Sequence, residues 1–337
     1  MNPLPLLVSL PREPESIDVL AGELDLTPDE RSLAVSLYSR GLPPLVHRKC
    51  LPYMFGVSPR LIAAMQKRAE HYYRRFTINK QGGGTRAIVA PRRFLKLIQT
   101  WINGHICSKE RMPECVMGFV RGRSIFDNGR AHCKNKNVMV VDVKDFFPSV
   151  TLQQVEAVFA SFGFPEEICR QLGGLCTLDG GLPQGAPTSP ALANLVFLSV
   201  DERLSRQAAE WNCTYTRYAD DIVFSGARHF ISEDVACLRE ILRQGGFTIN
   251  DRKTRIVGQG GRQTVTGLVV NGKALPPRSK RRRWRAMFHR AANHPHEFFD
   301  RARSLAGIAA FVNQYSSERA TEYGRIAQEV REKSQHR

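Results

Sequence analysis

Two adjacent aspartates, Asp220 and Asp221, most strongly constrain how this chain can fold. They follow the β-forming segment 213–217 and precede the apolar segment 222–224, which places them at the turn of a predicted β-hairpin. Buried carboxylates that lie side by side repel each other, and a fold tolerates such a pair when a cation neutralises it. The pair therefore predicts half of a divalent-metal site at the tip of a hairpin.

A third carboxylate, Asp142, ends another strand pattern. It belongs to the apolar run 138–143, which is typical of a buried central strand. If this strand lies beside the hairpin, Asp142, Asp220 and Asp221 converge at one edge of a sheet. Such a cluster could hold two Mg²⁺ ions about 3.5–4 Å apart, the arrangement that polymerases use for in-line phosphoryl transfer. Asp142 alone would be weak evidence, because many strand-terminal aspartates are turn or cap residues.

The charge of the chain indicates a polyanionic partner. Its 337 residues include 49 Lys and Arg against 32 Asp and Glu, which gives a formal net charge of +17. A compact protein accepts such self-repulsion most readily beside phosphates, so nucleic acid is the first candidate partner. A ribosome-binding or membrane-surface protein could be equally basic, and charge alone does not decide between them.

Cysteine, histidine and hydropathy patterns exclude several classes of protein. The eight cysteines form no C-x-x-C pair and the nine histidines no H-E-x-x-H motif, so we expect reduced, buried thiols and no structural zinc. The opening residues have no basic leader, and no apolar run reaches about 18 residues. These observations predict a cytoplasmic protein without membrane contact.

Periodicity and capping residues predict a mixed chain without a long linker or an internal repeat. Helices should start at Thr27-Pro28 and Ser58-Pro59, and segments 76–80 and 85–91 should form a hairpin across a glycine turn. Further predicted elements are helices at 95–108, 152–162, 189–204 and 232–244, strands at 138–143 and 247–249, a strand and turn at 264–272, and a basic helical segment from 278 onward.

Taken in order, these motifs resemble those of the reverse transcriptases, over roughly residues 70–315. Segment 141–147 is similar to the first catalytic motif of that family, 182–190 resembles its template and nucleotide loop, and 218–221 matches its Y-x-D-D box. The resemblance implies an α/β (α+β) right-hand polymerase fold, with fingers, a palm of mostly antiparallel sheet backed by helices, and a helical thumb. The implied domains are a helical N-terminal extension (1–50), fingers with part of the palm (51–135), the catalytic palm (136–272) and a basic helical thumb (273–337).

The resemblance also implies roles for the catalytic side chains. Asp142 and Asp220 would ligate two Mg²⁺ ions, Asp221 would support the metal site, and the backbone carbonyl of Val143 would add an oxygen ligand. Lys253 resembles the lysine proposed to protonate the departing pyrophosphate. A solvated lysine at a strand end is the alternative interpretation of Lys253.

Five further positions match nucleotide-binding residues of the family. Phe147 matches the steric gate, whose ring would clash with a ribose 2′-hydroxyl and so select deoxynucleoside triphosphates; an ordinary core phenylalanine is the alternative. Gln184 and Gly185 would lie under the incoming nucleotide and template, where the missing side chain of Gly185 allows close approach. Lys80 and Arg86 match fingers residues that grip the triphosphate, with solvated surface charge as the alternative.

Two motifs resemble the retron branch of the family. Asn128 and His132 match its Asn-Ala-x-x-His box, with Gly129 in place of alanine, and 265–267 matches its Val-Thr-Gly box. Asn128 and His132 share a helix face, from which they could hydrogen-bond RNA or brace the palm, and the sequence leaves both possibilities open. The residues assigned to RNA or primer are Asn128, His132, Tyr218, Val265, Thr266, Gly267, Arg281, Arg282, Trp284 and Arg285.

The segment from Arg278 to Arg290 carries seven cations around Trp284. It would suit a thumb helix that lies along a duplex backbone or a structured RNA, with Trp284 anchoring or stacking. A charged helix face without a ligand is the weaker alternative. Segment 305–312 is thumb-like, and we expect no maturase, DNA-binding or endonuclease segment after it, which favours the retron branch.

The resemblance predicts RNA-templated DNA synthesis. The partners would be a dedicated structured noncoding RNA that acts as template and primer, its DNA product, and deoxynucleoside triphosphates. The product would be a branched RNA–DNA molecule, made in anti-phage defence alongside a separate effector protein. The alternatives are a reverse transcriptase of the abortive-infection, diversity-generating, CRISPR-linked or group II intron-like kind, and a catalytically idle RNA-binding scaffold. The intact Leu-Pro-Gln-Gly loop argues against the diversity-generating kind.

Overall fold

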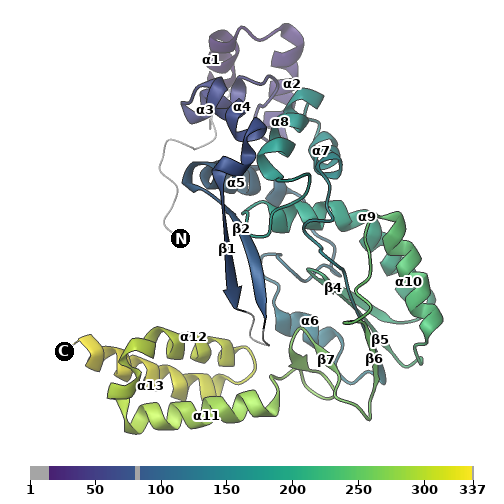
Figure 1. Cartoon of the computed structure of the whole chain (residues 1–337), viewed down its shortest axis with the longest axis vertical. Coiled ribbons are helices and arrows are strands. Elements are labelled where there is room, and N and C mark those ends of the chain that lie inside the picture. The colour runs from purple at the N-terminus through teal and green to yellow at the C-terminus, as the bar shows by residue number, and fades with distance from the viewer. Residues whose placement is uncertain (1–14, 80–83, 336–337) are drawn as a thin grey trace.

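The fold is organised around a four-stranded antiparallel sheet with the strand order β4-β5-β3-β6 (Figure 1). The computed structural model describes residues 15–79 and 84–335. The predicted apolar strand is β3, at the centre, and the predicted hairpin is β4–β5. This order brings the end of β3 and the hairpin turn to the same edge of the sheet. The strands are β3 (Asn137–Asp142), β4 (Thr214–Tyr218), β5 (Asp221–Gly226) and β6 (Arg255–Gly258).

Both faces of the sheet are covered, which explains why the four residues between the ends of β3 are all apolar. On one face, Met139 and Val141 join the main hydrophobic core of the chain. On the other face, Val138 and Val140 pack in a smaller cluster with the segment that follows β6. The elements that cover the sheet are α9 (Ser189–Glu210), α10 (Ser232–Gln244), α6 (Ile125–Ala131) and the short hairpin β7 (Thr264–Val265) and β8 (Leu268–Val269).

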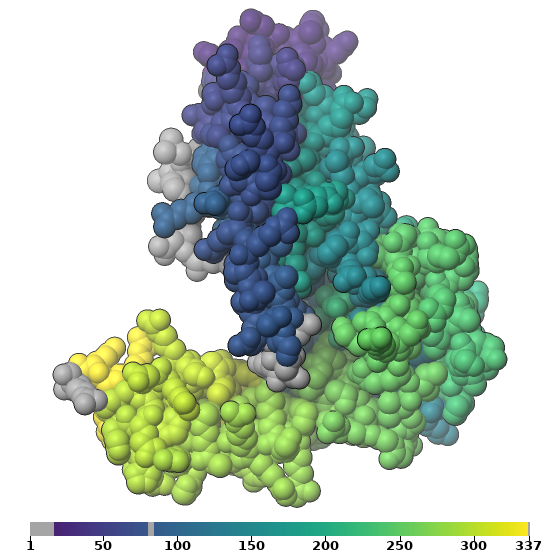
Figure 2. Space-filling model, in the orientation of Figure 1, coloured from purple at the N-terminus to yellow at the C-terminus, as the bar shows by residue number. Residues whose placement is uncertain are grey.

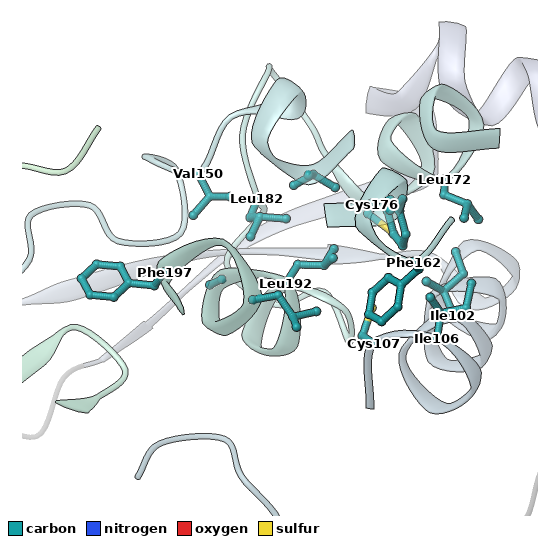
Figure 3. Packing of buried hydrophobic residues seen from close by; sticks show 14 of the residues in the cluster. Ile102, Ile106, Cys107, Val150, Phe162, Leu172, Cys176, Leu182, Leu192 and Phe197 are labelled. Carbon is teal, nitrogen blue, oxygen red and sulfur yellow. The ribbon is translucent and has the colours of Figure 1, made fainter. Parts of the chain in front are cut away.

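An N-terminal helical body continues the main core away from the sheet. Figure 3 shows Ile102 and Ile106 from this body in the same cluster of buried side chains as Leu192 of α9, with Phe162 and Cys107 drawn between them. The two predicted helix starts are confirmed, because the hydroxyls of Thr27 and Ser58 accept backbone N–H groups of the first turn. The helices of this body are α1 (Glu15–Leu24), α2 (Pro28–Ser39), α3 (Cys50–Phe55), α4 (Pro59–Lys67), α5 (Arg93–His105), α7 (Leu152–Ser161) and α8 (Glu166–Cys176), with 3-10 helices η2 (Ala69–Tyr72) and η3 (Cys107–Lys109).

A two-stranded hairpin extends from the helical body, as the sequence predicts. Strand β1 (Tyr73–Asn79) pairs antiparallel with β2 (Thr85–Pro91), and only Tyr73 of β1 is buried. In Figure 1 the hairpin points from the body toward the C-terminal helices. It is attached to the rest of the fold at its base, where the backbone N–H of Val89 donates to the Gln184 carbonyl.

The C-terminal helical module, residues 278–335, has a hydrophobic core of its own. Within it, Phe288 and Tyr323 stack with ring centroids 3.8 Å apart. Phe126 of α6 links the module to the sheet region, because its ring packs against Phe311 and Tyr315. Figure 2 shows the surface hollowed between this module and the N-terminal body. The module comprises α11 (Arg278–Asn293), the 3-10 helix η4 (Pro295–Arg301), α12 (Ala302–Asn313) and α13 (Ser317–Gln335).

One predicted strand is wrong. Segment 247–249 lies antiparallel beside the end of β3, but in it Ile249 forms only an isolated bridge to Val143. Strand β6 instead pairs along β3. Its four residues are exposed or half-buried, so hydrophobic alternation did not reveal it. In the part of the chain that the structure describes, no helix is long and apolar enough to span a bilayer.

Candidate active site

Three carboxylates meet at the edge of the sheet where β3 ends. Asp142 is the last residue of β3, and the strand register places it directly opposite Asp221, the first residue of β5. Asp220 stands in the turn before β5, after Ala219, whose backbone has a φ of 57°. The backbone N–H of Val143 donates to the Asp220 carbonyl over 2.9 Å, which fixes the turn against the end of β3. The predicted convergence of Asp142, Asp220 and Asp221 is confirmed.

The three carboxylates repel one another in a poorly solvated site. Burial, together with the charges of Asp220 and Asp142, raises the pKa of Asp221 to about 6. Burial and the Asp142 charge also raise the pKa of Asp220. Both pKa shifts mean that ionisation of these carboxylates is unfavourable in the metal-free site. A bound cation would offset the repulsion between them.

Asp142 is held by two side chains from the segment after α10. The Lys253 ammonium donates to Oδ1 of Asp142 over 2.6 Å, and the amide of Asn250 donates to Oδ2 over 3.1 Å. The hydrogen bond to Asp142 raises the pKa of Lys253. Lys253 therefore lies at the catalytic edge, as the resemblance implies. Asn250 was not predicted, because a single asparagine after a short apolar segment carries no distinctive signal.

The donor set consists of oxygen atoms, which suits hard cations such as Mg²⁺ rather than zinc or copper. Within residues 15–79 and 84–335, no group of three or more His, Cys, Asp or Glu side chains forms a cage that could hold a metal ion by itself. Mg²⁺ does not need such a cage, because it keeps several waters and takes one or two carboxylates together with substrate phosphates. The carboxylate oxygens of Asp142, Asp220 and Asp221 at one edge fit that requirement.

Among the predicted nucleotide-binding residues, Phe147 lies in the turn after β3, and Arg86 lies on β2. Phe147 is half-buried, with its ring 5.5 Å from that of Phe146 and 6.0 Å from that of Phe119. The pKa of Asp220 is raised overall, but the positive charge of Arg86 partly offsets this rise. The Arg86 guanidinium therefore lies within electrostatic reach of Asp220. Lys80 lies outside the described residues.

Gly185 lies close to strand β2 of the β1–β2 hairpin, which corresponds to the predicted fingers hairpin. Its φ is 133°, and a Cβ added there would lie 2.9 Å from Cγ2 of Ile88 and 3.1 Å from the Val89 carbonyl oxygen. The neighbouring Gln184 carbonyl accepts the Val89 N–H over 2.9 Å. The absence of a side chain at Gly185 thus allows this loop to pack closely against β2, in addition to any contact with nucleotide.

Comparison with known proteins identifies the family. The model of the family described as "Reverse transcriptase (RNA-dependent DNA polymerase)" matches residues 78–280, which is more than half of the chain. The chain belongs to the reverse transcriptases. This reverse transcriptase is 35% identical to the Retron Mx65 reverse transcriptase of Myxococcus xanthus, an alignment that covers 89% of this chain and 75% of that protein. It is 33% identical to the Retron Ec86 reverse transcriptase of Escherichia coli, over 75% of this chain and 80% of that protein.

These similarities show a retron-type reverse transcriptase, and hence an RNA-directed DNA polymerase. The α+β polymerase fold predicted from sequence is confirmed by the family. Enzymes of this family use divalent metal ions. Among solved structures, the reverse transcriptase is similar to telomerase from Candida albicans in complex with a fragment of telomeric RNA, with a TM-score of 0.40 and 11% identity over 60% of this chain and 46% of that one.

The side chains of Asn128 and His132 brace the four-stranded sheet of the reverse transcriptase from inside the protein. Both side chains are fully buried. The Asn128 carbonyl oxygen accepts from the Thr216 hydroxyl, and the His132 ring lies 2.7 Å from Oγ1 of Thr216 and 2.7 Å from Oγ of Ser225. The prediction that these side chains contact RNA is therefore wrong, because every polar atom of the pair points into the protein. Burial lowers the pKa of His132 to about 3.

The direction of these hydrogen bonds can be assigned. Because the Thr216 hydroxyl donates to Asn128, its oxygen must accept from Nε2–H of His132. Nδ1 of His132 then accepts from the Ser225 hydroxyl, whose oxygen accepts the Asn135 amide. The chain of bonds leaves His132 neutral and fully satisfied.

The Val-Thr-Gly box continues this bracing network. Val265 is fully buried among the valines of β3 and β5, so the prediction that its side chain contacts RNA is wrong. The Thr266 hydroxyl donates to the Ile125 carbonyl over 3.4 Å and lies 3.5 Å from the Asn128 amide. Gly267 is exposed at the tip of the β7–β8 turn with a φ of 79°. The two retron motifs are thus parts of one hydrogen-bonded structure.

A buried ion pair under the catalytic hairpin was missed. The Arg217 guanidinium donates from Nη2 and Nε to both oxygens of Asp201, over 2.6 and 2.8 Å, and both side chains are essentially inaccessible. Nη1 donates to Asn194, and the guanidinium lies 4.5 Å from the ring of Phe197. The signal in the sequence was the position of Arg217, which alternation along β4 places on the same face as the buried Tyr215.

The basic helix is α11, and its residues divide into two groups. Trp284 is buried in the core of the C-terminal module, edge-on to Phe311, so of its two predicted roles stacking on nucleic acid is wrong, whereas anchoring of the helix agrees with its burial. Arg281 is half-buried, and its Nε donates to the Pro276 carbonyl. Arg282 and Arg285 are exposed and free to face a ligand. Tyr218 is half-buried at the end of β4, opposite Asp221.

Proposed function

We propose that Asp142, Asp220 and Asp221 bind two Mg²⁺ ions and form the polymerising centre of this reverse transcriptase. The register that opposes Asp142 to Asp221 carries this proposal, because it fixes the backbone positions of the two residues directly opposite each other at one edge. Bound there, the ions would activate a primer 3′-hydroxyl and neutralise the leaving pyrophosphate. The Val143 carbonyl would supply a further oxygen ligand at the same edge.

The nucleotide would enter between the fingers hairpin and the carboxylates. We propose that Arg86, with Lys80, holds the triphosphate, since its charge already acts on Asp220. Phe147 would exclude a ribose 2′-hydroxyl by steric clash and so select deoxynucleotides. Gln184 and Gly185 would form the loop under the nucleotide and template. The hydrogen bond from the Val89 N–H to the Gln184 carbonyl fixes the position of this loop relative to β2.

Lys253 is proposed as the proton donor to pyrophosphate. Its ammonium pairs with Asp142, and a proton donor must lie within reach of the reacting groups. A Lys253→Met variant should lose roughly 10²–10⁴-fold in kcat. Lys253→Arg separates the two possible roles, because arginine keeps the positive charge beside Asp142 and does not release a proton. Full activity in Lys253→Arg would show that Lys253 acts through its positive charge and is not the proton donor.

Template and primer would lie across the palm and against the C-terminal module. We propose that Tyr218 contacts the primer beside the carboxylates, and that Arg282 and Arg285 on α11 face the nucleic-acid backbone. The corresponding domains are the N-terminal extension (1–50), fingers with part of the palm (51–135), palm (136–272) and thumb (273–337).

The retron relatives support a more specific role. We propose that the template and primer are one dedicated structured noncoding RNA, copied into a branched, multicopy single-stranded DNA joined to that RNA. We further propose that the complex acts in anti-phage defence with a separate effector protein.

Primer extension on an RNA template tests the catalytic proposal. Wild type should extend a DNA primer with Mg²⁺, and the double variant Asp220→Asn, Asp221→Asn should not. Asp18→Asn is the matched control, because Asp18 is exposed on α1 and pairs with Arg31 of α2 in the N-terminal helical body. Extension by the double variant at the wild-type rate would refute the metal-site assignment.

Nucleic acid that co-purifies with the protein tests the retron-specific role. A single species sensitive to both RNase and DNase, and cleaved at its junction by debranching enzyme, is the expected result. Recovery of only heterogeneous cellular RNA would contradict this role and leave the polymerase activity intact.

A further inference from the structure

Phe119 combines two features that packing alone does not explain. Its side chain is 49% exposed, and its backbone has a φ of 62°. A residue with a bulky side chain is disfavoured in this left-handed region, because its Cβ crowds the following carbonyl. Such a conformation persists where the surroundings impose it, and these sites are often functional.

The strained backbone of Phe119 is imposed by the catalytic hairpin. The segment 115–119 runs alongside β4, with Val116 bridged to Arg217 and the Met117 N–H donating to the Arg217 carbonyl over 2.7 Å. Gly118 lies directly on the turn, since a Cβ there would be 2.5 Å from the Ala219 nitrogen. The position of Phe119 is therefore tied to the turn that carries Asp220.

Two more contacts fix this segment. The Asn194 amide donates to the Gly118 carbonyl over 2.9 Å, and the same Asn194 accepts from the buried Arg217. Arg123 donates to the carbonyls of Met112, Pro113 and Val116, which closes the preceding loop. Phe119 projects from a rigid support, although its own ring is half in solvent.

The ring of Phe119 packs against Phe147, with centroids 6.0 Å apart and an interplanar angle of 44°. Phe147 contacts Phe146 on another side, and Phe146 is anchored in the core by Phe197 and Phe247. Phe147 is thus held between a core ring and an exposed ring. Removing Phe119 would leave Phe147 with more rotational freedom.

We propose that Phe119 is a positioning residue for sugar selection, holding the Phe147 ring in the orientation that excludes a ribose 2′-hydroxyl. This inference rests on the proposed function of Phe147 as the steric gate. A gate discriminates only if its ring cannot move aside, because a ribonucleotide needs little additional space. The link from Gly118 to Ala219 also couples the gate to the position of Asp220.

Single-nucleotide incorporation by the full-length protein tests the inference, with kcat/KM measured for a deoxynucleoside triphosphate and for the matching ribonucleoside triphosphate. Phe119→Ala should lower the ratio of the two by about tenfold, and Phe119→Tyr, which keeps a ring, should retain it. Phe119→Gly should also lower the ratio, and its backbone accepts the positive φ without strain, so any loss of selectivity is separated from misfolding. Tyr53→Ala, at an exposed aromatic residue of α3, is the control.

Phe147→Ala distinguishes this inference from the proposed function. If Phe147→Ala loses selectivity while folded Phe119→Ala and Phe119→Gly keep the wild-type ratio, the positioning role is overturned and the gate remains. If Phe147→Ala itself keeps the wild-type ratio, both fail.

Discussion

Asp142 and Asp221 stand directly opposite each other on β3 and β5, in a register fixed along the whole length of both strands. The backbone sets their separation, so the repulsion between them cannot be relieved by a local shift of one strand. In proteins, like charges held this close together are typical of sites that bind a ligand of opposite charge. The cost of the arrangement to the metal-free protein can be measured.

Replacing Asp221 by Asn should stabilise the metal-free protein at neutral pH. The pKa of Asp221 is raised from 3.8 to about 6, so the folded state is penalised when this group is ionised, by at most about 3 kcal/mol. The penalty is complete above about pH 6 and fades as pH falls toward 3.8. Urea denaturation in EDTA at pH 7.5 should show Asp221→Asn to be the more stable protein, with a smaller difference at pH 5.

Mg²⁺ should reverse this order. Binding to the folded state stabilises the wild type by mass action, and the Asn variant has lost a ligand, so titration with Mg²⁺ should raise the unfolding midpoint of the wild type more. Equal Mg²⁺-induced shifts in the two proteins would argue against Asp221 as a part of the metal site.

The Arg217–Asp201 pair should be essential for the stability of the palm. Replacing Arg217 by Met leaves the Asp201 carboxylate buried and unpaired, which costs about 3–5 kcal/mol. The double variant Arg217→Met, Asp201→Asn should recover part of this loss, because no charge stays buried. Denaturation midpoints of the three proteins check the prediction. A loss below about 1 kcal/mol in Arg217→Met would contradict it.

The sequence predicted the catalytic edge well because strand endings are local signals. An apolar run that ends in Asp142, and a β-hairpin signal around Asp220 and Asp221, determine both elements and the side on which they meet. Only the pairing of the two strands is non-local, and the opposed carboxylates already implied it. The capping residues Thr27 and Ser58 were equally local and equally well predicted.

The roles of the other motifs could not be predicted because they depend on burial. Asn128, His132 and Trp284 are polar or amphipathic residues in basic or polar surroundings, and the sequence does not show which face of their helices turns inward. The partners of His132, Thr216 and Ser225, lie on strands far away in the sequence. An interior hydrogen-bond network and an RNA-binding face use the same residue types.

Replacing His132 by Gln should flatten the pH dependence of stability. The pKa of His132 in the folded state, about 3, lies below the 6.5 of the unfolded state, so protonation favours unfolding. The stability it supports is complete above pH 6.5 and is lost progressively as pH falls from 6.5 toward 3, by about 2 kcal/mol at pH 5. Wild type should lose that much more stability than His132→Gln between pH 7 and pH 5, measured by urea denaturation. Parallel losses would show that the ring is protonated in the folded state.

Adding one methyl group to Gly185 should weaken nucleotide binding by displacing the loop from the fingers hairpin. In Gly185→Ala the new Cβ would crowd Ile88 and Val89, at a φ of 133° that alanine does not tolerate, which we expect to cost about 1–3 kcal/mol. The KM for deoxynucleoside triphosphate should rise, because the loop under the nucleotide is set by its contact with Val89. Gly324→Ala is the matched control: it lies within α13, with no described heavy atom within 4 Å of an added Cβ, and should stabilise by about 0.5–1 kcal/mol with unchanged KM. If both alanine variants behave alike, the close approach of Gly185 to β2 has no part in shaping the nucleotide site.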